Sequence, residues 1–154
     1  QALIEYIRIH YPYLKYQLLD GDVMRSSPIA KNTGFTKTDR LQHLRKMAYL
    51  ASMFANHGLL VICAFVSPYQ ESRKEIRRIA GKERYVEVYV KASKQTRITR
   101  DTKGLYQQAA TGHLQHLTGY NDVYEVPKKP TVVCNTDKLS VDKCVQKITL
   151  HILT

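Results

Sequence analysis

Apolar and polar residues alternate along the chain in two patterns, one typical of helices and one typical of strands. Apolar residues at helical spacing predict helices over residues 2–11, 39–56, 71–80, 94–100 and 141–153. Short apolar runs predict strands at residues 16–19, 59–66, 85–90 and 131–134. Because helices and strands alternate, we expect an α/β fold in which helices cover a parallel sheet.

Local sequence sharpens some of these boundaries. Thr38 or Asp39 is the predicted N-cap of the long helix that runs through Asn56. The run Leu59–Val66 is uninterrupted and apolar, so we expect a strand that is buried on both faces of the sheet. A polar loop with Pro28, Asn32 and Gly34 is predicted to follow Asp20.

Composition places the chain among globular proteins. With 154 residues, 44% of them hydrophobic and 24% charged, we expect one domain over residues 1–154. No apolar run approaches the roughly 20 residues of a membrane span, and no signal peptide is apparent, so no membrane partner is expected. Cys63, Cys134 and Cys144 are odd in number and far apart, which predicts reduced core thiols and a cytoplasmic protein.

The formal net charge of +11 favours an anionic partner, either a nucleic acid or a phosphorylated small molecule. Lysines and arginines are spread along the chain and form no block of five or more, which argues against a nucleic-acid stripe. A positive field focused on a nucleotide cleft would account for this charge equally well. The histidines have no metal-ligand spacing, so no metal site is predicted on the protein itself.

The most informative segment is Leu18–Arg25, where Asp20, Asp22 and Arg25 follow a predicted strand. A solvated Asp-Gly turn would explain Asp20 and Gly21 alone. However, polar residues also follow other predicted strands, as at Ser67 and 135–137, and ligands of open α/β folds bind at this edge of the sheet. Basic groups and a carboxylate gathered there predict a site that handles phosphate.

A series of motifs carries a resemblance to a known family. In chain order these motifs are Leu19–Arg25, Gly34–Thr36 with Asp39–Arg40, Phe65–Tyr69, Val86–Val90, Arg100–Tyr106, Thr118–Glu125 and Thr136–Val141. Together they resemble the adenylylsulfate (APS) kinases, which phosphorylate the 3′-hydroxyl of APS with MgATP to make PAPS. The resemblance implies a three-layer α/β/α parallel sheet of the P-loop nucleoside triphosphate hydrolase and kinase type.

The resemblance also implies roles for single residues. Asp22 would orient or deprotonate the acceptor hydroxyl, and Ser67, the second candidate catalytic residue, is a position phosphorylated in the family. The remaining acceptor-site candidates are Arg25 and Arg40 for the phosphosulfate, Phe35 for the base, His43, Val66, Lys103 on a mobile lid, and Leu117. Arg100 and Leu139 would lie at ATP, which brings Mg²⁺ as its co-substrate ion. Simpler interpretations are a helix-face Arg40, a core Phe35, a strand-ending Ser67 and a solvated turn at Lys103.

The chain departs from the family pattern in three places. His43 replaces an amide that contacts the acceptor nucleotide, and Leu117 replaces the second aromatic residue around its base, which predicts weaker selection for APS. The family also begins with a strand and a Gly-rich P-loop ending in Gly-Lys-Ser/Thr, whereas Gln1 already lies in the helix that should follow. We therefore expect this chain to be part of a longer protein.

Other functions are compatible with the same residues. The leading hypothesis is APS phosphorylation in sulfate assimilation. One alternative is a related kinase acting on another nucleotide, such as cytidine diphosphoramidate. Another is a non-catalytic, nucleotide-binding regulatory domain of an ATP sulfurylase. A homodimer and a fusion to, or association with, ATP sulfurylase are further open partner hypotheses.

Overall fold

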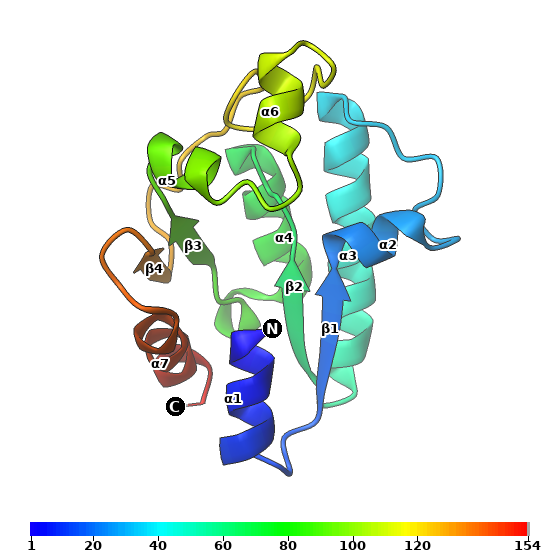
Figure 1. Cartoon of the computed structure of the whole chain (residues 1–154). Helices are drawn as coiled ribbons and strands as arrows, with labels where there is room; N and C mark the ends of the chain where they lie inside the picture. Colours follow the sequence, from blue (N-terminus) through cyan, green and yellow to red (C-terminus); the bar gives the residue numbers. More distant parts are fainter. Residues whose placement is uncertain (154) are drawn as a thin grey trace. The chain divides into compact units, whose positions relative to one another are not determined.

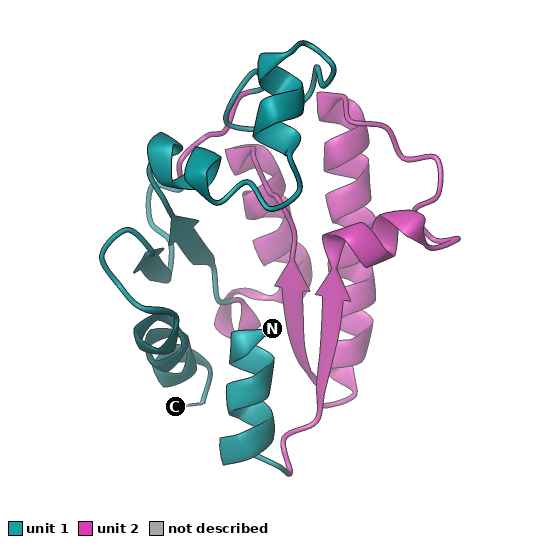
Figure 2. Cartoon of the chain, in the orientation of Figure 1, with its two compact units in different colours: residues 1–12, 86–122, 127–154 teal, residues 13–85, 123–126 magenta. Residues whose placement is uncertain are grey.

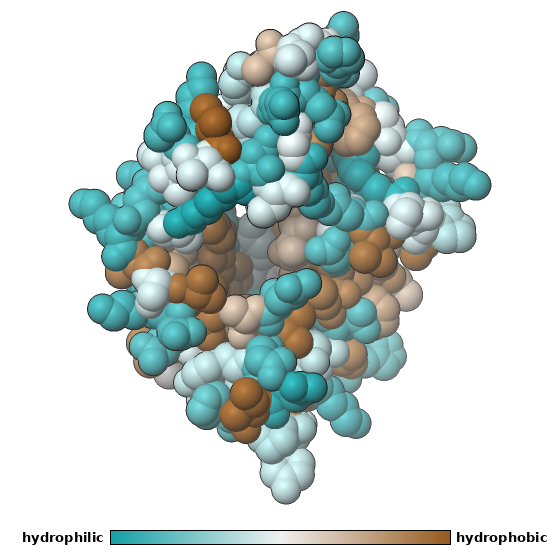
Figure 3. Space-filling model, viewed as in Figure 1, coloured by the Kyte–Doolittle hydropathy of each residue, from teal (hydrophilic) through white to brown (hydrophobic). Residues whose placement is uncertain are grey.

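The computed structural model describes residues 1–153, which form two compact units (Figure 2). Unit 1 contains Gln1–Pro12, Val86–Asp122 and the chain from Pro127 onward, and unit 2 contains Tyr13–Tyr85 and Val123–Val126. Hydrophilic side chains cover much of the face drawn in Figure 3, with apolar side chains among them. None of the helices in residues 1–153 is long and apolar enough to cross a membrane.

Unit 2 is built on a parallel pair of strands. Its elements in order are β1 (Tyr16–Asp20), α2 (Gly21–Ser26), α3 (Lys37–Asn56), β2 (Leu60–Ala64), α4 (Gln70–Ala80) and the 3₁₀ turn η1 (Lys82–Arg84). β1 and β2 run side by side in the same direction, with Tyr16 opposite Leu60 and Asp20 opposite Ala64 (Figure 1). Both strands therefore end at the same edge. α3 packs on both strands and on α4, over a core of Leu19, Met24 and Met47.

Unit 1 contains a second parallel pair. Its elements in order are α1 (Ala2–His10), β3 (Val88–Lys91), α5 (Lys94–Thr99), α6 (Leu105–Ala110), β4 (Val132–Asn135) and α7 (Val141–Ile152). β3 pairs with β4 from Val88 opposite Val132 to Lys91 opposite Asn135. α7 packs on β4 and α1 packs on α7, around a core of Val132, Cys134 and Cys144.

The parallel α/β fold is confirmed, whereas several predicted local features are wrong. The N-cap of α3 is Thr36, not Thr38 or Asp39. Thr36 Oγ1 accepts the Asp39 N–H at 3.2 Å, and the Asp39 carboxylate accepts the Thr36 N–H at 3.2 Å, which is a complete capping box. Asp39 occupies the third helical position instead of the N-cap. The prediction that Asp39 is the N-cap therefore lies three residues beyond the true one, Thr36.

The prediction of a doubly buried strand over 59–66 is also wrong. β2 stops at Ala64, and both Cys63 and Ala64 are exposed. Among the described residues β2 pairs on one edge only, with β1, and a strand with one neighbour keeps part of its surface open. Cys63 is thus no core thiol, whereas Cys134 and Cys144 are buried, and all three cysteines are free.

Candidate functional site

The chain directly after Asp20 forms the helix α2 with Asp20 as its N-cap, whereas Pro28, Asn32 and Gly34 lie in a loop, as predicted. Asp20 Oδ1 accepts the N–H groups of Asp22 at 3.0 Å and Val23 at 3.3 Å. A Cβ on Gly21 would lie 3.1 Å from the Ala64 carbonyl oxygen, so glycine permits the close approach of α2 to the end of β2. This local geometry places the exposed Asp22 in the first turn of α2, at the edge where β1 and β2 end.

Arg25, Phe35 and Arg40 form a cation–aromatic cluster in unit 2. The guanidinium carbon of Arg25 lies 4.5 Å from the centre of the Phe35 ring, and that of Arg40 lies 5.5 Å from it. Arg25 Nη1 donates to the carbonyls of Thr33 at 3.0 Å and Gly34 at 3.2 Å, while Arg40 Nε donates to the Phe35 carbonyl at 3.0 Å. The backbone thus holds both cations beside the ring.

The burial of these groups rules out their simpler interpretations. Phe35 is 52% exposed and is therefore not a core residue, whereas Arg40 is buried and is not a solvated helix-face arginine. Burial, followed by the charge of Arg40, lowers the pKa of Arg25, although arginine remains a cation at neutral pH. The cluster offers a partly exposed aromatic ring with two fixed positive charges, a combination suited to a base and its anionic group.

His43 is an unusual member of the same region. It is 3% exposed, and among the described residues neither Nδ1 nor Nε2 has a hydrogen-bond partner. Its ring meets Phe65 edge to face, with 5.7 Å between ring centres. Burial, and then the charges of Arg25 and Lys46, lower the pKa of His43, so the imidazole is neutral at pH 7 and offers one donor and one acceptor.

The loop after β2 carries Val66 and Ser67 and is held by a residue that sequence reasoning missed. Val66 is exposed and Ser67 is half-buried. Arg73 on α4 is buried, and its Nη1 donates to the Ser67 carbonyl at 2.6 Å. No pattern in the sequence marks Arg73, because an arginine in an amphipathic helix is ordinarily an exposed residue.

The remaining candidates lie in unit 1. Arg100 is exposed and donates to the Thr136 hydroxyl and carbonyl, each at 3.1 Å. Lys103 lies in the turn before α6, whose N-cap Gly104 is left-handed with φ of 64°. Leu117 is half-buried, and Leu139 packs against the core of Val132, Cys134 and Cys144. The acceptor-side candidates apart from Lys103 and Leu117 therefore belong to unit 2, where Arg25, Phe35 and Arg40 are in contact, and the ATP-side candidates belong to unit 1.

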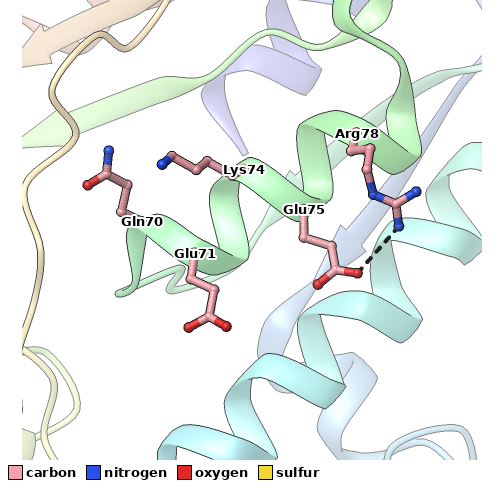
Figure 4. A pocket seen from close by; sticks show the side chains of 5 residues that line it. All are labelled: Gln70, Glu71, Lys74, Glu75 and Arg78. Atoms are coloured by element: carbon pink, nitrogen blue, oxygen red, sulfur yellow. Dashed lines mark ion pairs between the residues drawn. The ribbon is translucent and has the colours of Figure 1, made fainter.

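A separate hollow lies along the exposed side of α4. Figure 4 shows its lining side chains, Gln70, Glu71, Lys74, Glu75 and Arg78. Glu75 is engaged by Arg78 at 3.5 Å and by Arg45 on α3 at 2.9 Å. None of the predicted site residues lines this hollow, so we do not assign the site to it.

Comparison with known proteins defines the class of the chain. The described fold matches solved structures of P-loop kinases. The structure of the Mycobacterium tuberculosis APS kinase in complex with AMPPNP and APS superposes with a TM-score of 0.88 over 99% of this chain and 87% of that one, at 28% identity. A protein named APE1195 gives a TM-score of 0.83 over 98% of this chain and 83% of that one, at 38% identity.

Sequence comparison narrows this class to one family. The family model for adenylylsulphate kinase matches residues 6–135. A probable adenylyl-sulfate kinase of Aeropyrum pernix is 42% identical over 130 residues, which cover 83% of this chain and 70% of that protein. An adenylyl-sulfate kinase of a Synechococcus strain is 39% identical over 135 residues, 88% of this chain and 75% of that protein. The chain belongs to the adenylylsulphate kinase family.

Proposed function

We propose that the protein transfers the γ-phosphoryl group of ATP to the 3′-hydroxyl of APS, which yields PAPS for sulfate assimilation. The observation that carries this proposal is the cluster of Arg25, Phe35 and Arg40 beside Asp22, in a member of the adenylylsulphate kinase family. An aromatic face with two fixed guanidinium groups is complementary to a nucleotide that carries a phosphosulfate.

Acceptor binding rests on the residues of unit 2. The exposed Phe35 ring stacks on the base, while Arg25 and Arg40 bind the phosphosulfate oxygens. Both guanidinium groups already donate to backbone carbonyls, so little reorganisation is needed when the anion arrives. Val66 and Ser67 flank the same edge of the β1–β2 pair. Lys103 and Leu117, which belong to unit 1, remain acceptor-site candidates on the family resemblance alone.

The chemical step is an in-line phosphoryl transfer. Asp22 accepts the proton of the 3′-hydroxyl while the hydroxyl oxygen attacks the γ-phosphorus of ATP. The bond between the γ-phosphorus and the oxygen that bridges it to the β-phosphate breaks, and ADP is released. Arg100 and Leu139 bind ATP. Mg²⁺ enters with ATP as its complexed ion and neutralises charge on the transferring phosphate. Because ATP is made in the cell interior and all three cysteines are free, a cytoplasmic location is part of this proposal.

A second candidate function is phosphorylation of a different nucleotide. It is favoured by His43, whose buried neutral ring stands where the family has an amide and requires a ligand group of different reach. By the family resemblance, Leu117 also replaces the second aromatic residue around the base, which reduces the advantage of a purine.

The experiment that separates these functions compares acceptors. The full-length protein is incubated with MgATP and either APS or cytidine diphosphoramidate, and ADP release is followed at several acceptor concentrations. We expect a higher kcat/KM with APS. A higher kcat/KM with the cytidine nucleotide would replace the APS assignment, and no turnover with either acceptor would support a regulatory domain instead.

A further inference from the structure

The short segment Val123–Val126 belongs to unit 2, although the chain on both sides of it belongs to unit 1. It is fastened to the loop that follows β2. The Glu125 N–H donates to the Pro68 carbonyl at 2.8 Å, and the Glu125 carboxylate accepts the Gln70 N–H at 2.6 Å. Gln70 is the first residue of α4, so this carboxylate also lies at the positive end of the helix.

Arg73 of α4 also joins the segment 123–126 to the loop after β2. Its Nη1 donates to the Ser67 carbonyl at 2.6 Å, and its Nη2 donates to the Glu125 carbonyl at 2.7 Å. The side chain is 6% exposed, so both hydrogen bonds are shielded from water. A planar guanidinium can bridge two carbonyl groups in fixed directions, whereas the compact ammonium of a lysine cannot reproduce this fork. One buried side chain therefore joins the loop after β2 to the returning segment.

The loop between these contacts has little freedom. Pro68 and Tyr69 are buried, and Ser72 Oγ donates back to the Tyr69 carbonyl at 2.7 Å. Val66 and Ser67, near the start of the loop after β2, flank the proposed acceptor site. A change in the contacts of Arg73 therefore moves the Ser67 backbone first.

We propose that Arg73 and Glu125 are positioning residues that hold the Val66–Ser67 backbone in the geometry that binds the acceptor. This inference rests on the proposed function and assigns to that site two residues outside the predicted set. They touch no reacting atom and act through the backbone of Ser67. Loss of the link raises the KM for the acceptor and leaves ATP binding unchanged.

Steady-state kinetics of four variants test this role. Arg73→Lys keeps the charge but removes the fork, and Glu125→Ala removes the acceptor for the Gln70 N–H. Glu125→Gln keeps an oxygen in that place and serves as the conservative rescue. Arg78→Lys is the matched control, because Arg78 is an exposed arginine on the same helix.

We expect Arg73→Lys and Glu125→Ala to raise the KM for APS about tenfold, within the range that small misplacements produce. The kcat should change less than threefold, and the Kd of AMPPNP less than twofold. Glu125→Gln and Arg78→Lys should leave all three constants close to wild type. The proposal would be overturned if folded Arg73→Lys and Glu125→Ala proteins had an unchanged KM for APS. It would also be overturned if these variants lost acceptor binding and AMPPNP binding equally.

Amide hydrogen exchange gives a readout that does not need turnover. The Gln70 amide, which donates to Glu125 in the wild type, should exchange at least tenfold faster in Glu125→Ala and retain its protection in Arg78→Lys. Unchanged protection of Gln70 in Glu125→Ala would refute the link itself. If the wild type fails to phosphorylate APS, the proposed function fails, and the exchange result alone then supports or refutes the fastening of the loop.

Discussion

Replacing His43 with leucine should stabilise the protein and weaken acceptor binding at the same time. Leucine fills a similar volume without polar atoms, and His43 buries two ring nitrogens that lack hydrogen-bond partners among the described residues. An unsatisfied buried polar group destabilises a protein by about 1–3 kcal/mol. We therefore expect the free energy of unfolding to rise by about 1–3 kcal/mol, with about 2–4 °C in Tm for each kcal/mol.

The same change removes a group that we expect to contact the acceptor. A neutral hydrogen bond contributes about 0.5–1.5 kcal/mol, which corresponds to a rise of about twofold to tenfold in the KM for APS. Thermal unfolding followed by circular dichroism gives Tm, and initial rates of PAPS formation give KM. His151→Leu, at an exposed histidine of α7, is the control and should alter neither value. A lower Tm, or a higher Tm with unchanged KM, would refute this interpretation of His43.

The pH dependence of the wild type tests the same residue. Burial and the charges of Arg25 and Lys46 lower the pKa of His43 in the folded state. The unfolded chain then binds a proton at higher pH than the folded chain does. The stability associated with a neutral His43 is present above the unfolded value of about 6.5 and is lost as pH falls through the folded pKa. Stability should therefore begin to decrease below about pH 6.5, whereas acceptor affinity should decrease only at lower pH, where the folded protein protonates His43; His43→Leu should flatten both profiles.

Further predictions address the remaining parts of the account. Asp22→Asn should lower kcat by at least about 10²-fold with little change in Tm, and near-normal turnover would remove Asp22 from the mechanism. Leu117→Phe together with His43→Asn restores the family pattern and should raise kcat/KM for APS about tenfold, or about 1.4 kcal/mol; no gain would mean that these substitutions are neutral. Gly21→Ala places a Cβ 3.1 Å from the Ala64 oxygen and should destabilise the protein by about 1–3 kcal/mol in urea titrations; an unchanged midpoint would contradict the packing. Chelation of Mg²⁺ with EDTA should abolish turnover, and restored Mg²⁺ should recover it.

Long periodic segments, the short strands and α5 were predictable from the sequence, whereas the short helices α2 and α6 were not. The long helix α3 and the closing helix α7 follow their apolar spacing closely, with α7 ending at Ile152. The six-residue helices α2 and α6 are too short to show a helical period. α2 depends on Asp20, whose carboxylate caps it, and an Asp-Gly pair predicts a turn equally well.

Motifs predicted which residues to examine, but the contacts among them came only from the fold. The family resemblance is confirmed, and its motifs include Arg25, Phe35 and Arg40, whose mutual contact depends on the fold. The burial of Arg73 and His43 could not be predicted, because tertiary packing decides which polar side chains lose water. The roles of all these residues remain predictions that kinetics must test.

The most direct test of the central proposal identifies the phosphorylated product. The full-length protein is incubated with ATP labelled in the γ-phosphate, Mg²⁺ and APS, in parallel with the 3′-deoxy analogue of APS. The account predicts that label appears in PAPS in a one-to-one ratio with ADP, and that the 3′-deoxy analogue receives none. Label in the 3′-deoxy analogue, or ADP formed from APS reactions without labelled PAPS, would contradict it.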